Sequence, residues 1–283
     1  MAVAEFEEKE FEGAFNRELP VTDFWSPGQV GEAKYGFDAT FFFAGPFLFR
    51  GFGFERYPRG IKLNERRWLR FFNEADAVLP PFRLNLFIQY KRPARVRGHR
   101  AAEWSYWQRA YYRYDLAQHQ LNRLILLERE IGLKGLVVYA SPAFHTKSQL
   151  WANMRRRKLV DKTNYVRPTT IEGHHRYSYI SAGTVGLACS EETPTSDPEF
   201  RDMLSQAWES NAPRAFSKLV DEAGGGIARS MVETEDQGRS TFQTISNYLQ
   251  GDSRAPIIGA LANIFAFNFV YGTSLNCLGG ELI

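Results

Sequence analysis

Two polar side chains at alternate positions of one apolar segment, Gln89 and Lys91, are the residues best placed to do chemistry. They end the run 84–91, which is rich in β-forming residues and is predicted to be a strand. Alternate residues of a strand share a face, so the amide and the amine should project together. Asp38 stands in a second predicted strand, 37–43, and would lie beside them if the two strands pair. An acid and an amide oxygen can hold a hard cation such as Mg²⁺, and a nearby lysine can stabilise phosphate charge.

Further carboxylates precede these strands. Residues 4–19 form an acidic segment in which an apolar residue recurs every four positions and which ends at a proline, so an amphipathic helix is expected. Among its acids, Glu10 is the preferred partner for the cation. Glu32, in the predicted loop 21–36, is the alternative.

The elements that must position these residues alternate between helix and strand. The expected order begins with a helix at 4–19 and strands at 37–43 and 84–91, followed by a long helix at 102–131 and a strand at 136–140 that is buried on both faces. This order predicts a layered α/β core. Further expected elements are a helix at 64–76, a helix at 149–158, a strand at 176–181, a helix at 199–223 and a helix-breaking triplet at 224–226.

This order of elements, with Asp38 on one strand and Gln89-Tyr90-Lys91 on the next, resembles the PD-(D/E)XK, or restriction-endonuclease-like, nuclease superfamily. The resemblance implies a restriction-endonuclease-like core (α-β-β-α-β) with insertions, covering about residues 1–190. Residues 191–283 would then be a C-terminal helical extension, serving interaction or oligomerisation.

The resemblance also implies roles for individual residues. Asp38 would be a metal ligand, Gln89 would occupy the first position of the (D/E)XK motif, and Lys91 would be the catalytic lysine. Glu10 would be the helix glutamate, with Glu32 as its rival. Mg²⁺, or Mn²⁺ in its place, would be the cofactor, and the implied activity is hydrolysis of phosphodiester bonds of DNA or RNA, with a role in bacterial defence against phage or mobile DNA.

Two departures from the family pattern keep a second interpretation open. Glutamine replaces the second acid of the motif, and the gap between Asp38 and Gln89 is long. The alternative is therefore a non-catalytic nuclease-fold module that binds nucleic acid or a partner protein. In the plainest interpretation, Asp38 only caps a turn after Gly36 and Lys91 is a solvated strand end.

A basic segment follows Lys91 directly. Arg92, Arg95, Arg97 and Arg100 are the predicted nucleic-acid contacts, because cationic side chains beside a phosphodiester site bind the backbone. The alternative is a solvated basic loop. A second basic run, at 155–158, could meet a phosphate track with only some of its members, because four successive helical residues point in different directions.

Composition excludes several classes of protein. The chain has 283 residues, 35 Lys and Arg against 32 Asp and Glu, and 44% hydrophobic residues, which fits a globular protein rather than a disordered chain or a coiled-coil rod. No P-loop, GxSxG or complete dinucleotide-binding fingerprint is present. The N-terminus lacks a secretory signal, and the most apolar stretch, 257–271, is shorter than the ~20 residues that span a bilayer. These features predict a cytoplasmic protein that does not enter the membrane. The family resemblance implies DNA as the favoured partner, with a partner protein or a second copy of the chain as further candidates.

Overall fold

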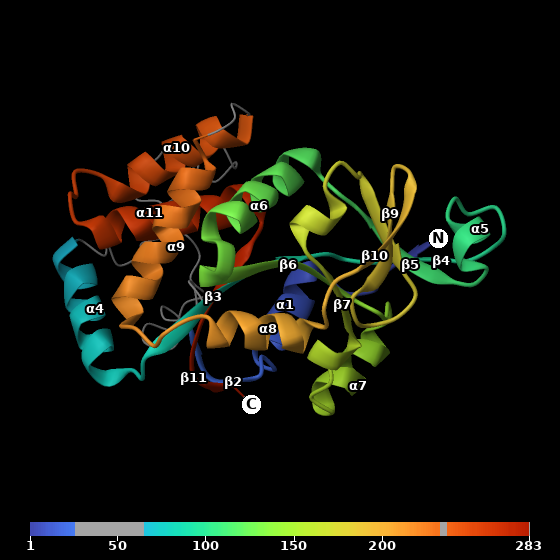
Figure 1. Cartoon of the computed structure of the whole chain (residues 1–283), viewed down its shortest axis with the longest axis horizontal. Helices are drawn as coiled ribbons and strands as arrows, with labels where there is room; N and C mark the ends of the chain where they lie inside the picture. The colour runs from blue at the N-terminus through green and yellow to red at the C-terminus, as the bar shows by residue number, and fades with distance from the viewer. Residues whose placement is uncertain (26–64, 233–236, 283) are drawn as a thin grey trace, which may run out of the picture.

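Two β-sheets and their covering helices make up the computed structural model, which describes residues 1–25, 65–232 and 237–282 (Figure 1). The strands are β1 (Ala2–Val3), β2 (Val21–Trp25), β3 (Phe82–Tyr90), β4 (Ala94–Val96), β5 (Tyr111–Asp115), β6 (Gly135–Pro142), β7 (Thr163–Val166), β8 (Arg176–Tyr179), β9 (Val185–Cys189), β10 (Glu192–Ser196) and β11 (Ser274–Leu282). The helices are α1 (Glu8–Asn16), α4 (Glu65–Val78), α5 (Trp104–Trp107), α6 (Gln118–Ile131), α7 (Lys147–Arg155), α8 (Phe200–Glu209), α9 (Phe216–Ser230), α10 (Gln237–Gln250) and α11 (Pro256–Tyr271). The mixed α/β class expected from the sequence is confirmed. The strand expected at 37–43 lies outside the described residues.

The five-stranded sheet has the order β2-β11-β3-β6-β7 and holds the Gln89-x-Lys91 segment. β3 and β6 run parallel, with Gln89 opposite Tyr139, and the other neighbours are antiparallel. Both strands were expected from their apolar runs, and β6 is buried along its whole length as predicted. After β3 the chain passes through β4 and β5 of the six-stranded sheet and returns through helix α6 to β6. A connection of this length is what two parallel strands, here β3 and β6, require.

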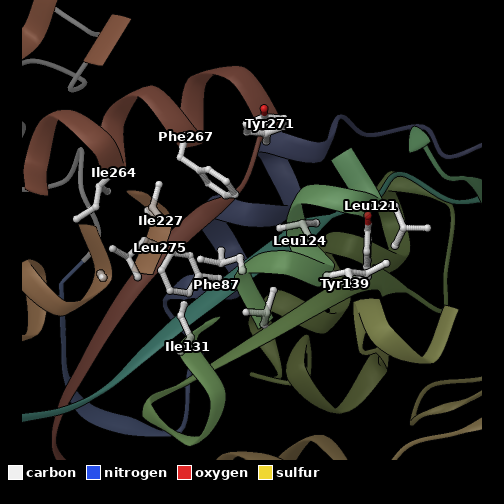
Figure 2. Packing of buried hydrophobic residues seen from close by; sticks show 14 of the residues in the cluster. Phe87, Leu121, Leu124, Ile131, Tyr139, Ile227, Ile264, Phe267, Tyr271 and Leu275 are labelled. Atoms are coloured by element: carbon white, nitrogen blue, oxygen red, sulfur yellow. The ribbon is translucent and has the colours of Figure 1, made fainter. Parts of the chain in front are cut away.

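Helices cover both faces of this sheet, which gives a three-layer core (Figure 1). Leu86 and Ile88 of β3 face the layer of α1 and α8, whereas Phe87 faces the layer of α6, α9 and α11. Figure 2 shows the second of these clusters, in which Leu124 of α6 and Phe267 of α11 meet on β3 and β6. Because β3 is buried on both faces, its polar Gln89 must find hydrogen-bond partners inside the protein.

The six-stranded sheet has the order β1-β4-β5-β8-β9-β10. Four tyrosines of β5 and β8 share one face of it, which we call the tyrosine face: Tyr112, Tyr114, Tyr177 and Tyr179. This face packs on the carboxyl end of β6, where the Tyr179 hydroxyl donates to the Ser141 hydroxyl at 2.7 Å. Ser141 in turn donates to the Lys91 carbonyl at 3.0 Å. The tyrosine face therefore stands directly beside the end of β3.

The long helix expected at 102–131 is wrong in its first half. The chain there forms the four-residue helix α5, then strand β5, and only then helix α6. Aromatic residues near helical spacing suggested one helix, but Tyr111, Tyr112 and Tyr114 are strong β-formers that pair with β4 and β8. The loop expected at 21–36 also begins as a strand, β2.

The triplet at 224–226 does not break a helix but lies inside α9. A Cβ at Gly224 would lie 2.4 Å from the Cα of Ala260, so the glycine lets α9 and α11 approach closely. The segment 199–223 is also two helices, α8 and part of α9, rather than one.

The C-terminal region is built into the core. β11 pairs with β2 on one side and with β3 on the other, so it occupies an interior position of the five-stranded sheet. Helices α9 and α11 complete the hydrophobic cluster on one face of that sheet. The chain on both sides of residue 190 thus builds the same sheet and the same cores.

Candidate functional site

A chain of hydrogen bonds holds Lys91 just beyond the end of β3. The amine of Lys91 donates to the side-chain carbonyl of Gln120 at 2.7 Å. The amide nitrogen of Gln120 donates to the side-chain oxygen of Gln89 at 2.9 Å and also to the backbone carbonyl of Tyr271. Thr273 adds a donor to the same Gln89 oxygen at 3.3 Å. Every polar atom of the Gln120 side chain is therefore used, which fixes the orientation of its amide.

The surroundings of Lys91 disfavour its charged form. Burial lowers the pKa of the amine, and the carboxylate of Glu8 counters this only in part. The ammonium lies 5.6 Å from the centre of the Tyr139 ring, in cation–π range. The hydroxyl of Tyr139 is buried and has no hydrogen-bond partner within residues 1–25, 65–232 and 237–282. A half-buried lysine beside an unused hydroxyl is a departure from ordinary packing, and such groups gather at functional sites.

The chain segment that joins α11 to β11 completes this arrangement. Gly272 follows α11 in a left-handed conformation, with φ of 65°, which a residue with a side chain adopts at a cost. The turn presents the carbonyl of Tyr271 and the hydroxyl of Thr273 to the two glutamines. Residues 184 positions apart in the chain, Gln89 and Thr273, thus meet at one point.

The structure separates Glu10 from this network. Its carboxylate accepts the backbone N–H of Glu7 at 2.9 Å, which holds the pKa of Glu10 below its ordinary value, and it pairs with Lys147 at 3.4 Å. The α1 acids that turn toward the central sheet are Glu8 and Glu12. Glu8 accepts the backbone N–H of Arg92 at 3.0 Å.

Glu12 accepts the hydroxyl of Ser274 on β11. Two residues further along the same face of β11, Asn276 is fully buried, and neither atom of its side-chain amide has a hydrogen-bond partner among the described residues. This is the face covered by α1, whereas Gln89 is bonded to α6 on the other face. The Glu12 carboxylate and the Gln89 amide therefore lie on opposite sides of the sheet, whereas Glu8 lies at the end of β3, where its charge acts on Lys91.

Two of the expected metal ligands, Asp38 and Glu32, lie outside the described residues. Within residues 1–25, 65–232 and 237–282, no three His, Cys, Asp or Glu side chains come together in a group that could hold a metal ion. The side-chain oxygen of Gln89 already accepts two hydrogen bonds. The described residues alone thus do not complete a cation site, and a further acid such as Asp38 would have to supply it.

The four arginines after Lys91 divide into two kinds. Arg92 is a structural residue: its guanidinium bonds the carbonyl of Ala4 at 3.0 Å and the carboxylate of Glu7 at 2.9 Å. Arg95, Arg97 and Arg100 have no ion pair within the part of the chain that the structure describes, and Arg97 and Arg100 are exposed. These three remain the candidates for phosphate contacts.

The basic run at the end of α7 is exposed. Lys158 pairs with Asp161 at 2.9 Å. Arg157 has a positive φ of 51° in the turn that ends the helix, a conformation that favours glycine. Trp151, one helical turn before Arg155, is 58% exposed, which is unusual for a side chain of that size.

From the sequence, Gln120 on the long helix could reach the site, but core packing was the favoured role, and Glu8 was not placed at the end of β3. The partners of Gln120 come from two segments far apart in sequence, the end of β3 and the end of α11. The only signal for Glu8 was its place on an acidic helix, where several glutamates compete.

Comparisons of the chain with models of known protein families, with curated proteins and with solved structures find no match. In the described residues, no helix has the length and apolar character needed to cross a membrane. The geometry at the end of β3 is therefore the basis for a functional proposal.

Proposed function

We propose that this protein is a Mg²⁺-dependent nuclease of the PD-(D/E)XK type, with DNA as its favoured substrate. The observation that carries the proposal is the Lys91 amine, partly withdrawn from water and fixed by Gln120 at the end of a central strand. A purely structural lysine would be expected to pair with a carboxylate or to extend into water. A lysine aimed by a neutral amide keeps its charge available for a ligand.

The role of Lys91 follows from its donors. A protonated amine has three N–H groups, and the bond to Gln120 uses one of them. The others can donate to a non-bridging oxygen of a phosphodiester, where charge grows as the bond breaks. Because the amine is partly buried, that interaction is stronger than in bulk water. Its lowered pKa also brings the amine closer to exchanging a proton near neutral pH.

The cation is a separate part of the proposal. Mg²⁺, or Mn²⁺, would polarise the phosphate and lower the pKa of a bound water. It is usually held by one or two carboxylates together with waters and substrate oxygens. Asp38 with an α1 glutamate would meet that need, and the side-chain contacts favour Glu8 or Glu12 over Glu10.

The experiment is a cleavage assay with the purified full chain. Supercoiled DNA, single-stranded DNA and RNA are each incubated with Mg²⁺ or Mn²⁺. We expect Lys91→Met to abolish cleavage and Lys134→Met to leave it unchanged. Lys134 is exposed and lies directly before the first residue of β6, at the end of the sheet away from Lys91. Equal rates for the wild type and Lys91→Met would remove the proposed role of the lysine.

A second candidate is a nuclease-like module that binds nucleic acid, or a partner protein, without cutting. Two observations favour it: the Gln89 oxygen is occupied by protein donors, and the α1 acid Glu12 lies on the other face of the sheet. This candidate predicts binding that survives Lys91→Met, weakens with salt and weakens in Arg95→Ala and Arg97→Ala. Cleavage that depends on both Asp38 and Lys91 would decide against it.

The cellular setting is proposed from the same resemblance. We place the protein in the bacterial cytoplasm as an effector of defence against phage or mobile DNA, assembled with a partner protein or a second copy of itself. Phage plating on cells that carry the wild type or Lys91→Met tests the defence role. Light scattering of the purified chain tests self-association, and a strictly monomeric species alone and in its host would exclude it.

A further inference from the structure

A cluster of cationic and aromatic side chains lies at the edge of the tyrosine face, outside the hydrogen-bond chain around Lys91. It consists of Arg95, Arg97, Tyr112 and His145. The guanidinium of Arg95 lies 5.8 Å from the centre of the Tyr112 ring, and the imidazole of His145 lies 6.2 Å from the same ring. Arg95 pairs in register with Tyr112. Arg97 follows directly after β4, and its charge acts on both Tyr112 and His145.

The two arginines of this cluster, Arg95 and Arg97, have no ion pair among the described residues. Burial, then the charges of Arg95 and Arg97, lowers the pKa of His145. The same two arginines act against the rise that burial imposes on the pKa of Tyr112. The charges of two guanidinium groups therefore act on the imidazole and the phenol together, and no carboxylate in the described part of the chain pairs with either arginine.

His145 has an unused polar atom at the centre of the cluster. Its Nδ1 is buried and has no hydrogen-bond partner in the part of the chain that the structure describes, although its backbone N–H and carbonyl are both bonded. Glu5 is the acid that faces it, and the carboxylate of Glu5 is engaged by the backbone N–H of Lys147 at the start of α7. An orphaned ring nitrogen among cations calls for an anionic partner.

We infer that Arg95, Arg97 and His145 form a phosphate subsite that holds one phosphodiester group of the nucleic acid next to the group that Lys91 contacts. Two arginines and an imidazole are the donor set that matches the oxygens of a phosphate. The subsite adjoins Lys91 through a continuous path: Tyr112 stacks on Tyr179 at 5.6 Å, and Tyr179 bonds Ser141, which bonds the Lys91 carbonyl. The inference rests on the proposed function for the identity of the ligand, but not for the existence of an anion site.

The first test uses the intact protein, inorganic phosphate and no metal. The chain has five histidines, so their ring signals can be followed by NMR, and the His145 signal is assigned by its loss in His145→Gln. A bound phosphate favours the imidazolium, and we expect its addition to move the His145 titration midpoint upward by about 1 pH unit. The groups that face this ring are Arg95, Arg97, Tyr112 and Glu5, so the same titration is run on Glu5→Gln to separate its charge from that of the ligand.

Matched variants make the test specific. Arg97 is exposed, so Arg97→Gln should fold normally and should lose most of the phosphate-induced movement, whereas Lys134→Gln should keep it. In salt titrations with a nucleic acid, Arg97→Gln should reduce the slope of log affinity against log salt by about 0.9 for duplex DNA or about 0.7 for a single strand. A His145 midpoint that phosphate does not move in the wild type overturns the subsite. So does a slope that Arg97→Gln leaves unchanged.

The outcomes separate the subsite from the nuclease proposal. A phosphate-dependent midpoint in a protein that cuts nothing would retain the subsite and remove the nuclease. Cleavage that depends on Lys91, without any movement of the His145 midpoint, would retain the nuclease and remove the subsite.

Discussion

Replacing Gln120 by leucine tests the arrangement at the end of β3 most directly. The change removes the acceptor of the Lys91 amine and the donor to both Gln89 and the Tyr271 carbonyl. A hydrogen bond to a charged group contributes about 1.5–3 kcal/mol, and each neutral bond about 0.5–1.5 kcal/mol. Burying the apolar leucine returns about 1–2 kcal/mol. We therefore expect Gln120→Leu to lower the free energy of unfolding by about 3 kcal/mol.

A domain with an ordinary stability of about 5–15 kcal/mol should still fold after this loss. Urea unfolding followed by tryptophan fluorescence measures it, with an unchanged slope showing that both states keep their compactness. Gln118→Leu is the matched control: Gln118 is exposed on the same helix and bonds only carbonyls, so its loss should stay within about 0.5 kcal/mol.

A double-mutant cycle isolates the bond between Gln120 and Lys91. With Lys91→Met as the second change, the coupling energy should be at least about 1.5 kcal/mol, since the bond is charge-assisted and partly buried. The reasoning is refuted if Gln120→Leu costs no more than Gln118→Leu. It is also refuted if the coupling lies within about 0.5 kcal/mol of zero.

Three further outcomes are expected. Arg157→Gly should raise the free energy of unfolding by about 0.5–1 kcal/mol, because glycine accepts a φ of 51° without strain. Arg156→Gly, one residue earlier where the backbone is helical, should lower it by a similar amount. Thermal melts compare the two variants, and equal effects would contradict this account. Gly224→Ala should lower the free energy of unfolding by about 3 kcal/mol or more, because its Cβ would strike the backbone of α11. In Gly225→Ala the new Cβ meets only the flexible side chain of an arginine, so the free energy of unfolding should rise by up to about 1 kcal/mol. Urea midpoints of the two variants that shift in the same direction would exclude the close contact between α9 and α11. Because the pKa of Lys91 is lowered in the folded state, the unfolded chain binds more protons than the folded chain just below pH 10.5. The free energy of unfolding of the wild type, relative to Lys91→Met, should therefore rise as the pH increases through this window. A difference that does not change across alkaline pH would show that the amine is not desolvated.

The parts of the fold that the sequence could predict are those set by local patterns. The runs at 84–91 and 136–140 became β3 and β6 because continuous apolar, β-forming segments suit strands that are buried on both faces. The expected apolar stripe of the first helix, Phe11, Phe15 and Leu19, is buried as predicted, although the helix itself spans only Glu8–Asn16.

The parts that could not be predicted depend on contacts between distant segments. β11 contains two successive glycines and three polar residues, so no local pattern marks it as an interior strand. It is a strand because β2 and β3 both pair with it. The neighbours of His145 also come from distant segments, because only the fold brings it against side chains of β4 and β5.

The interior position of β11 has a consequence for biosynthesis. β2 and β3 are held in one sheet by β11, which is synthesised after both of them. The sheet can therefore form only after residues 274–282 have left the ribosome. Pairings over such sequence separations form slowly, and the segments that wait for them stay exposed. The turn that bonds Gln89 and Gln120 belongs to the same late segment. In a nascent or truncated chain, the hydrogen bonds around Lys91 would therefore be incomplete. The site at the end of β3 forms only when translation of this region is complete.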